Sequence, residues 1–226
     1  MRFQGRFYLI CKTCAHIVLP KVRTPDAASF VSPAVYVCHH QNMRGPLSTM
    51  IWLPVPVHSW SLALFFDRKE LRDHFARYTF GERFGWPKPL ANLAGAICCG
   101  PVSAMIKSMG AIRVYRKANP ALARKTFQES IGALTRQENL IIYPDVRYDS
   151  DEEQIGEMYK GFLLLERLYY SKTNEHLPFV PLHYSPRSRE IRMGAAIRFP
   201  DGDFHDNMDA VYHEIRDAIN ALARAG

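Results

Sequence analysis

The stretch AVYVCHHQNMRGP, residues 34–46, begins with a β-branched and apolar run and ends in two histidines, a polar pair and a Gly-Pro break. This pattern predicts a buried strand that ends at a histidine, followed by a turn into a helix. A histidine at a strand end is a candidate general base, because its ordinary pKa of about 6.5 lets it take a proton near neutral pH. The alternative is a histidine with a purely structural role.

Outward from this stretch, short apolar runs alternate with helical patterns. Beyond the strand at 34–38, strands are predicted at 57–66, 110–116, 140–143, 179–182 and 191–199. Helices are predicted at 47–53, 68–78, 89–106 (one or two helices), 120–138, 155–170 and 208–222. The alternation predicts an α/β fold with a mostly parallel central sheet flanked by helices, whose site lies at the carboxyl ends of the strands. His40, Arg116 and Asp145 all fall at such ends.

The length of 226 residues and a hydrophobic share of 47% suit one domain with an N-terminal appendage. We expect an amphipathic helical segment and linker at residues 1–30, followed by an α/β domain at 31–226. Within residues 1–22, Phe3, Phe7 and Ile10 follow helical spacing among basic residues, which is typical of a helix that lies in the lipid interface. A helix packed on its own domain is the alternative.

The charge balance favours anionic partners. Lys and Arg number 29 against 22 Asp and Glu, a net charge of +7, which suits phosphorylated ligands or lipid headgroups. The basic residues are scattered and no nucleic-acid module is present, so we expect no nucleic-acid partner. The uncharged stretch 89–106 is broken by glycines and a proline and is no convincing membrane span. We therefore expect any contact with a membrane to be made from its surface.

Five cysteines without framework spacing favour reduced, cytoplasmic surroundings. The sequence has no nucleophile elbow, no phosphate-cradling glycine-rich loop, no dinucleotide fingerprint and no zinc spacing. A histidine without a nucleophile of its own suits the deprotonation of a substrate hydroxyl, and arginines at strand ends suit a phosphate. Arg116 is equally well explained as a solvated charge, Asp145 as a turn former or helix cap, and His39 as a supporting neighbour.

Four ordered blocks stand out: HQNMRGP at 40–46, the strand 110–116 from Gly to Arg, YPDVRY at 143–148, and Val180-Pro181. In these blocks the chain resembles the glycerolipid acyltransferases typified by 1-acyl-glycerol-3-phosphate acyltransferase. That family has a His followed by four residues and Asp, a Gly-led strand that ends in Arg, Phe-Pro-Glu-Gly-Thr-Arg-Ser, and a Val-Pro strand. Order and spacing agree from about residue 31 to residue 199, most of the chain.

The resemblance implies transfer of a fatty acyl group from acyl-CoA or acyl carrier protein to the hydroxyl of a lysophospholipid such as 1-acyl-glycerol-3-phosphate. His40 would take the hydroxyl proton as general base. Arg116 and Arg147 would hold the acceptor's phosphate, and Asp145 would orient its glycerol moiety. The resemblance implies no metal and no bound cofactor. It places the protein as a peripheral or monotopic protein on the cytoplasmic face of a membrane.

The blocks also depart from the family pattern. Gly45 stands where the family has the aspartate that orients the histidine, so a backbone carbonyl, an aspartate of residues 145–151, or no group would take that role. Val146 and Arg147 replace Gly and Thr, and Tyr148 falls where the family's arginine sits. Two other functions therefore stand beside the first: a non-catalytic or weakly active membrane lipid-binding homologue, and an acyltransferase for a different acceptor.

Overall fold

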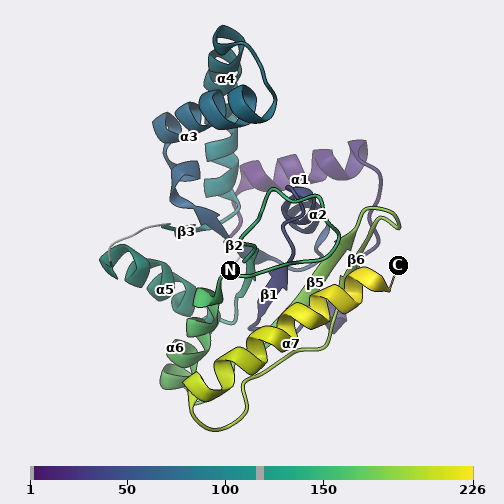
Figure 1. Cartoon of the computed structure of the whole chain (residues 1–226), viewed down its shortest axis with the longest axis vertical. Helices are drawn as coiled ribbons and strands as arrows, with labels where there is room; N and C mark the ends of the chain where they lie inside the picture. The colour runs from purple at the N-terminus through teal and green to yellow at the C-terminus, as the bar shows by residue number, and fades with distance from the viewer. Residues whose placement is uncertain (1–2, 116–119, 226) are drawn as a thin grey trace. The chain divides into compact units, whose positions relative to one another are not determined.

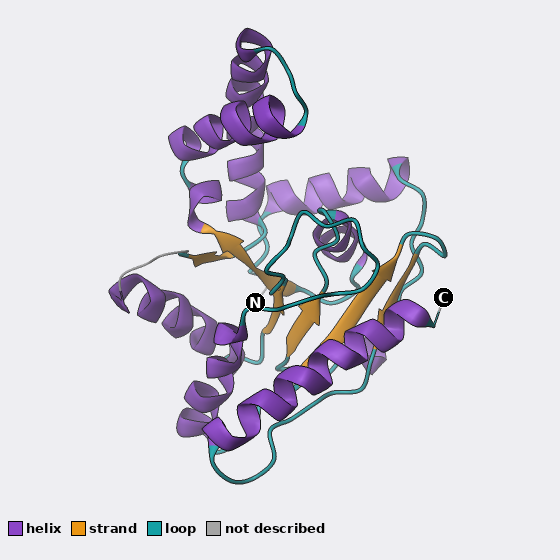
Figure 2. Cartoon of the chain, in the orientation of Figure 1, coloured by secondary structure: helices purple, strands orange, loops and turns teal. Residues whose placement is uncertain are grey.

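The computed structural model describes residues 3–115 and 120–225 and shows an α/β structure with a six-stranded, mostly parallel sheet flanked by helices (Figures 1 and 2). This confirms the predicted class of fold. The strand order is β3-β2-β4-β1-β5-β6. The strands are β1 Val35–Cys38, β2 Val57–Leu62, β3 Ile112–Val114, β4 Asn139–Ile142, β5 Phe179–Ser185 and β6 Glu190–Met193.

The helices occupy most of the regions in which the sequence predicts them. The α-helices are α1 Arg6–Val18, α2 Arg44–Trp52, α3 Arg68–His74, α4 Lys88–Ser108, α5 Pro120–Thr135, α6 Leu164–Thr173 and α7 Phe204–Arg224. Shorter 3-10 segments are η1 Ala27–Ser29, η2 Ala63–Phe66 and η4 Lys160–Leu163, and η3 Phe75–Arg83 is a π-helix. Arg116, the predicted phosphate ligand after β3, lies outside the described residues.

The chain forms two compact units, which we describe separately. The larger unit consists of Cys14–His58 and the chain from Phe127 onward, and the smaller unit of the described residues within 1–13 and 59–126. This division differs from the one expected at residue 30. Strands β1, β4, β5 and β6 belong to the larger unit, together with His40, Asp145 and Arg147. The described part of the candidate site therefore lies within one unit.

Within the larger unit, parallel pairing joins the strands that lead to the site. Strand β1 pairs in parallel with β4, with Val37 opposite Ile142, and in parallel with β5. Strand β6 runs antiparallel to β5. Because β1 and β4 run in the same direction, the residues that follow them leave the sheet at the same edge, which is where open α/β sheets place ligands.

The core of the larger unit surrounds β1. All four residues of β1 and all four of β4 are buried, as expected for apolar strands covered on both faces. Helix α7 packs along β5 and buries Val211, Ile215 and Ile219 (Figure 1). Its start is capped by Asp203, whose side chain accepts a hydrogen bond from the His205 amide at 2.7 Å.

Two predicted elements differ from the structure. Residues 155–159, expected in a helix, instead pair with the loop after β4: Met158 and Asp145 form an antiparallel bridge, and the Tyr159 amide donates to the Pro144 carbonyl at 2.8 Å. The helix prediction was wrong there because long-range backbone pairing outweighs the local helical spacing. Strand β6 ends at Met193 rather than near 199: the Gly194 amide still donates to the Pro181 carbonyl, but Pro181 has no amide to return the bond, and beyond it Ile197 meets Phe179 only as an isolated bridge.

In the smaller unit, α3 and η3 pack against α4. Asp67 caps α3 by accepting hydrogen bonds from the Lys69 and Glu70 amides at 2.8 and 3.0 Å, which confirms the predicted cap. Helix α4 continues without interruption through Pro101. By length and composition alone, α4 is the one helix among the described residues that could cross a membrane, and 28% of its most apolar stretch is buried.

Candidate active site

The ends of β1 and β4 bring His39, His40 and Asp145 together. The carboxylate of Asp145 bonds both histidines: one oxygen contacts Nδ1 of His39, and the other accepts the backbone amide of His40 at 3.0 Å. The side chains of Asp145 and His39 are only 3% and 2% exposed. A buried carboxylate is stabilised when donors reach both of its oxygens. Asp145 thus ties the end of β4 to the end of β1.

His39 is enclosed on both sides of its ring. Its Nδ1 faces Asp145, and its Nε2 lies 3.0 Å from the backbone carbonyl of Glu152. Both partners are oxygens, so either ring nitrogen finds an acceptor when it carries a proton. Because the Glu152 carbonyl covers Nε2, the buried ring of His39 presents neither nitrogen to a substrate. His39 therefore supports the site from within, as its predicted role as a neighbour suggests.

Two buried groups beside this pair stay neutral. Burial, and then the positive charges of His39 and Arg192, lower the pKa of His183 to about 4. The Nδ1 atom of His183 has no hydrogen-bond partner among the described residues. Burial, and then the charge of Asp145, raise the pKa of the Cys38 thiol well above its ordinary value. His183 and Cys38 are therefore uncharged near neutral pH beside the pair of His39 and Asp145.

His40 is partly exposed and lies between two tyrosines. The ring centroids of Tyr143 and Tyr148 are 5.9 and 5.8 Å from that of His40, both edge to face. The backbone amide of Met43 donates to Nδ1 of His40 at 3.3 Å. An Nδ1 that accepts a hydrogen bond is unprotonated, so the neutral ring carries its proton on Nε2. A backbone donor thus occupies the place of an orienting carboxylate.

The turn after His40 has an uncommon backbone. Gln41, Asn42 and Met43 have φ angles of 45°, 51° and 77°, three consecutive residues in the left-handed region. A side chain in that region costs about 1–2 kcal/mol per residue, and such strain clusters at functional sites. The turn lets the chain reverse within a few residues, so that the Gly45 amide donates back to the His40 carbonyl at 3.1 Å.

Gly45 is required by a close approach of the backbone. A Cβ atom at this position would lie 1.9 Å from the carbonyl oxygen of His39 and 3.2 Å from that of His40. The first turn of α2 therefore rests directly on the end of β1. An aspartate at position 45, which the family pattern has there, does not fit this backbone. Asp145 is instead the acid that contacts the histidine pair.

The acidic loop 145–153 is fastened to the turn. The side chain of Asn42 donates to Asp151 at 3.1 Å, and the amide of Asn42 donates to the Tyr148 carbonyl at 3.3 Å. Arg44 lies 3.6 Å from Asp151. These contacts hold the loop against the turn, so that the Glu152 carbonyl reaches His39. The carboxylates of this loop also make the surroundings of the turn acidic, as the sequence indicates.

The predicted site residues are only partly gathered. His40 and Asp145 meet through the His40 backbone amide. Arg147 is exposed on the same loop, two residues after Asp145. The Asp145 side chain points inward to the histidines and is almost fully buried. Tyr143, Tyr148 and the Glu152 carbonyl were not predicted as part of the site.

One signal in the sequence could have separated the two histidines. Successive residues of a strand point to opposite faces, so one of two adjacent histidines at a strand end faces inward and the other outward. The structure follows this rule, with His39 buried and His40 partly exposed. The Glu152 carbonyl has no comparable signal, because the position of a backbone oxygen depends on the fold of the whole loop.

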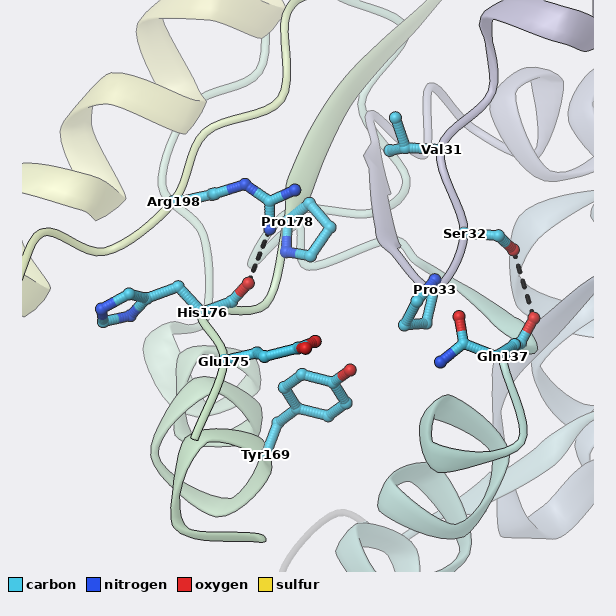
Figure 3. A pocket seen from close by; sticks show the side chains of 9 residues that line it. All are labelled: Val31, Ser32, Pro33, Gln137, Tyr169, Glu175, His176, Pro178 and Arg198. Carbon is cyan, nitrogen blue, oxygen red and sulfur yellow. Dashed lines mark hydrogen bonds between the residues drawn. The ribbon is translucent and has the colours of Figure 1, made fainter. Parts of the chain in front are cut away.

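A cavity of about 320 Å³ lies at the opposite ends of the same strands (Figure 3). It is lined by residues that precede β1, β4 and β5, among them Pro33, Gln137, Glu175 and Pro178, and by Arg198, which follows β6. Figure 3 shows Arg198 beside His176, whose backbone carbonyl accepts from the arginine at 2.6 Å. This cavity is therefore separate from the histidine pair. No metal-binding group of three or more His, Cys, Asp or Glu side chains occurs among the described residues.

No protein-family model matches the chain, and no curated protein matches it.

Proposed function

We propose that the protein is an O-acyltransferase that moves a fatty acyl group from acyl-CoA or acyl carrier protein to the hydroxyl of a lysophospholipid such as 1-acyl-glycerol-3-phosphate. The observation that carries the proposal is the cluster in which Asp145 holds the His39 ring and the His40 backbone at adjacent strand ends. It supports a partly exposed histidine at the edge where parallel α/β sheets bind ligands. The fold would then be of the glycerolphosphate acyltransferase type.

In the proposed reaction, His40 takes the proton of the acceptor hydroxyl as the oxygen attacks the thioester carbonyl. The carbon–sulfur bond breaks, the new ester bond forms, and the thiolate leaves with the proton that His40 held. Reaction through Nε2 requires that this nitrogen be unprotonated. The hydrogen bond from the Met43 amide to Nδ1, 3.3 Å long, must therefore open when the acceptor binds, because it fixes the other tautomer.

The substrate contacts follow from the exposed groups near His40. Arg147 is the described arginine of the loop that can grip the acceptor's phosphate, and Arg116 remains a second candidate. Because both oxygens of Asp145 are already bonded, we assign its contribution to the placement of His39 and His40 rather than to direct contact with glycerol. The proposal needs no metal and no bound cofactor, since the thioester is the activated donor.

The proposed acceptor and product are lipids, so the protein would work as a peripheral or monotopic protein on the cytoplasmic face of a membrane. Helix α1 supports this placement. Its Ile10, Ile17 and Val18 are 61%, 78% and 79% exposed, which leaves apolar side chains for a lipid interface. The five cysteines are all free, in keeping with the reduced surroundings proposed.

The test is acyl transfer to lysophosphatidic acid from labelled acyl-CoA and from labelled acyl carrier protein. His40→Ala should lower kcat at least about a hundredfold, the usual contribution of a general base. His213→Ala, an exposed histidine of α7, serves as the matched control and should leave the rate unchanged. Equal rates for wild type and His40→Ala would exclude His40 as the base. Absence of transfer to every acceptor offered would exclude the enzyme.

A second function, lipid binding without catalysis, is favoured by one observation. The Met43 amide donates to Nδ1 of His40 and so favours the tautomer of the neutral ring with its proton on Nε2. A general base would need a lone pair on that nitrogen. In that case lysophosphatidic acid would bind to wild type and to His40→Ala alike, with no product formed. Equilibrium binding measured beside the transfer assay separates the two functions.

A further inference from the structure

Helix α4 of the smaller unit buries its small residues and exposes its large ones. The residues buried on α4 are Ala91, Gly95, Cys99, Gly100 and Ser103. By contrast, Leu90, Leu93 and Ile97 are 48%, 58% and 64% exposed. A helix that faces water normally has the reverse arrangement, with its large apolar side chains in the core. Small residues at helix contacts with large ones outside are typical of helices that face lipid.

The residues on the buried face of α4 are small because the helix approaches its neighbours closely. A Cβ atom at Gly95 would lie 2.9 Å from the carbonyl oxygen of Arg72 and 3.2 Å from the amide of Ala76. At Gly100, the guanidinium of Arg68 occupies the corresponding space, 2.7 Å from such a Cβ. Helices α3 and η3 therefore cover one side of α4 tightly, and the leucine and isoleucine side chains have no place there.

Between its two terminal lysines, helix α4 has no charged side chain. From residue 89 to residue 106 the sequence contains no Asp, Glu, Lys or Arg, and Lys88 and Lys107 stand at the two ends. At about 1.5 Å per residue, the exposed face of this stretch is about 27 Å long. The turn before it exposes Phe84 and Trp86 by 54% and 39%, and Trp86 stacks on Phe80 with ring centroids 4.9 Å apart. Aromatic side chains of this kind concentrate at membrane interfaces.

The charges around this face favour a lipid surface over a second copy of the chain as its binding partner. Between residues 81 and 108 the basic residues are Arg83, Lys88 and Lys107, and the one acid is Glu82. In a symmetric pair of α4 helices, Lys88 would meet Lys88 or Lys107 of the second copy, so like charges would face each other. An anionic lipid surface instead attracts every one of these cations.

We propose that α4 lies in the plane of an anionic lipid bilayer, with Leu90, Leu93 and Ile97 in the acyl region and Trp86 at the headgroup level. The helix does not cross the bilayer, because its other side carries α3 and η3, whose charged residues include Arg72 and Arg77. This surface is distinct from the N-terminal helix α1. The inference does not depend on acyl transfer, since it concerns binding alone.

The test is co-flotation of the full chain with vesicles of phosphatidylglycerol and phosphatidylcholine. Leu93→Glu with Ile97→Glu should lower the partition coefficient at least about tenfold. Two apolar side chains that enter the acyl region are lost, and the two added carboxylates are repelled by the anionic lipid. The matched control is Leu168→Glu, an exposed leucine of α6, which should bind as wild type does. Ile17→Glu with Val18→Glu on α1 tests the other apolar helix in the same assay.

Trp86 provides a second readout. Its fluorescence should shift to the blue on vesicles and be quenched by brominated lipid, and Trp86→Phe should remove most of this response. Unchanged partitioning of the α4 variant would overturn the proposal, as would loss of binding in the α1 variant alone. Concentration-dependent self-association of wild type that the α4 variant abolishes, without vesicle binding, would assign the face to a second copy instead. Vesicle binding by an inactive protein would leave this inference intact while the proposed reaction fails.

Discussion

The backbone around position 45 leaves room for the hydrogen atom of glycine but not for a Cβ atom. The site therefore cannot recover an orienting carboxylate by a single substitution there, although the family pattern has aspartate at this place. The sequence identifies Gly45 as a departure but not as a necessity, because the clash involves the carbonyl of His39, whose position depends on the left-handed turn between them. Residue patterns pointed to His40 and Asp145, which the structure brings together, but not to Tyr143 and Tyr148 beside His40. Nor did the patterns predict which of the site's partners are backbone atoms.

Replacement of Gly45 by alanine should destabilise the fold. The added Cβ would sit 1.9 Å from the His39 carbonyl, so β1 and α2 must separate, and we expect a loss of about 3 kcal/mol in the free energy of unfolding. Urea titration measures it, with an unchanged m-value as evidence of the same native state. Gly132→Ala in α5 is the control: its Cβ would meet only Arg136 at 3.5 Å, and the helix should gain up to about 1 kcal/mol. Equal effects of the two substitutions would contradict the proposed clash.

His183 should make the protein sensitive to acid. Its pKa in the folded protein, about 4, lies below the ordinary value of about 6.5, so the unfolded chain binds a proton that the native state refuses. Stability should fall from pH 6.5 towards pH 4, and His183→Leu should remove a slope of about 1.4 kcal/mol per pH unit. Urea titrations of both proteins across this range give the difference.

His176 has the opposite dependence on pH and does not disturb that comparison. Burial lowers its pKa, but bonds to Glu166 and Asp201 outweigh burial and raise it overall. Its contribution is therefore present below the unfolded pKa and is lost as pH rises through the folded one, opposite in sign to that of His183. Both proteins contain His176, so its effect cancels in the difference between them. A difference that does not change with pH would show that His183 titrates normally.

Among the elements, strands and long helices follow the sequence closely, whereas loop 145–159 does not. The apolar runs of β1, β4 and β5 and the stripe of α7 reflect burial, which periodicity reports directly. Residues 155–159 have helical spacing, yet their backbone pairs with residues 144–146. Long-range pairing of this kind leaves no local pattern. The same loop supplies the carbonyl that covers His39, so the part of the site missed in the sequence is the part built by loop pairing.

The left-handed turn between β1 and α2 stores strain that a glycine would relieve. Met43 has a φ of 77° and is 41% exposed, so Met43→Gly should raise the free energy of unfolding by about 1 kcal/mol. Leu47→Gly, at an exposed position inside α2, should lower it by about the same amount, because glycine weakens a helix interior. Thermal melting of the two variants beside wild type decides the sign. A loss of stability in Met43→Gly would mean that its side chain contributes more than its backbone costs.

Across the whole molecule, the sequence predicts the class of fold and the edge of the sheet at which His40 and Asp145 meet. It does not predict the division into two units: residues 59–126 contain 12 Lys and Arg against 4 Asp and Glu, but a local excess of positive charge does not by itself mark a boundary. Nor does the sequence show that α4 packs through the face that carries its small residues. Ala91, Gly95 and Cys99 indicate close packing only once the neighbouring helices are known. Hydropathy reports how apolar a helix is, and packing decides which face stays uncovered.

The free cysteines offer a probe of the site in the intact protein. Cys14 is exposed, whereas Cys38 is buried and has a raised pKa, and the thiolate is the reactive form. A colorimetric disulfide reagent should therefore modify Cys14 in the native protein and reach Cys38 only on unfolding. Cys38→Ser should leave the native reaction trace unchanged and remove one thiol from the count in denaturant. Loss of a fast native phase in that variant would show that the end of β1 opens readily.

The clearance at Gly45 also affects how related chains can be recognised. A search keyed to an acid five positions after the histidine selects for a carboxylate that this backbone excludes. Chains built in the same way would instead carry two adjacent histidines, four further residues and a glycine, with the acid displaced to the end of the strand that pairs with the first. Such a motif combines two segments that are distant in the sequence, the histidine pair after one strand and the acid after its neighbour, because the two strands pair in the sheet.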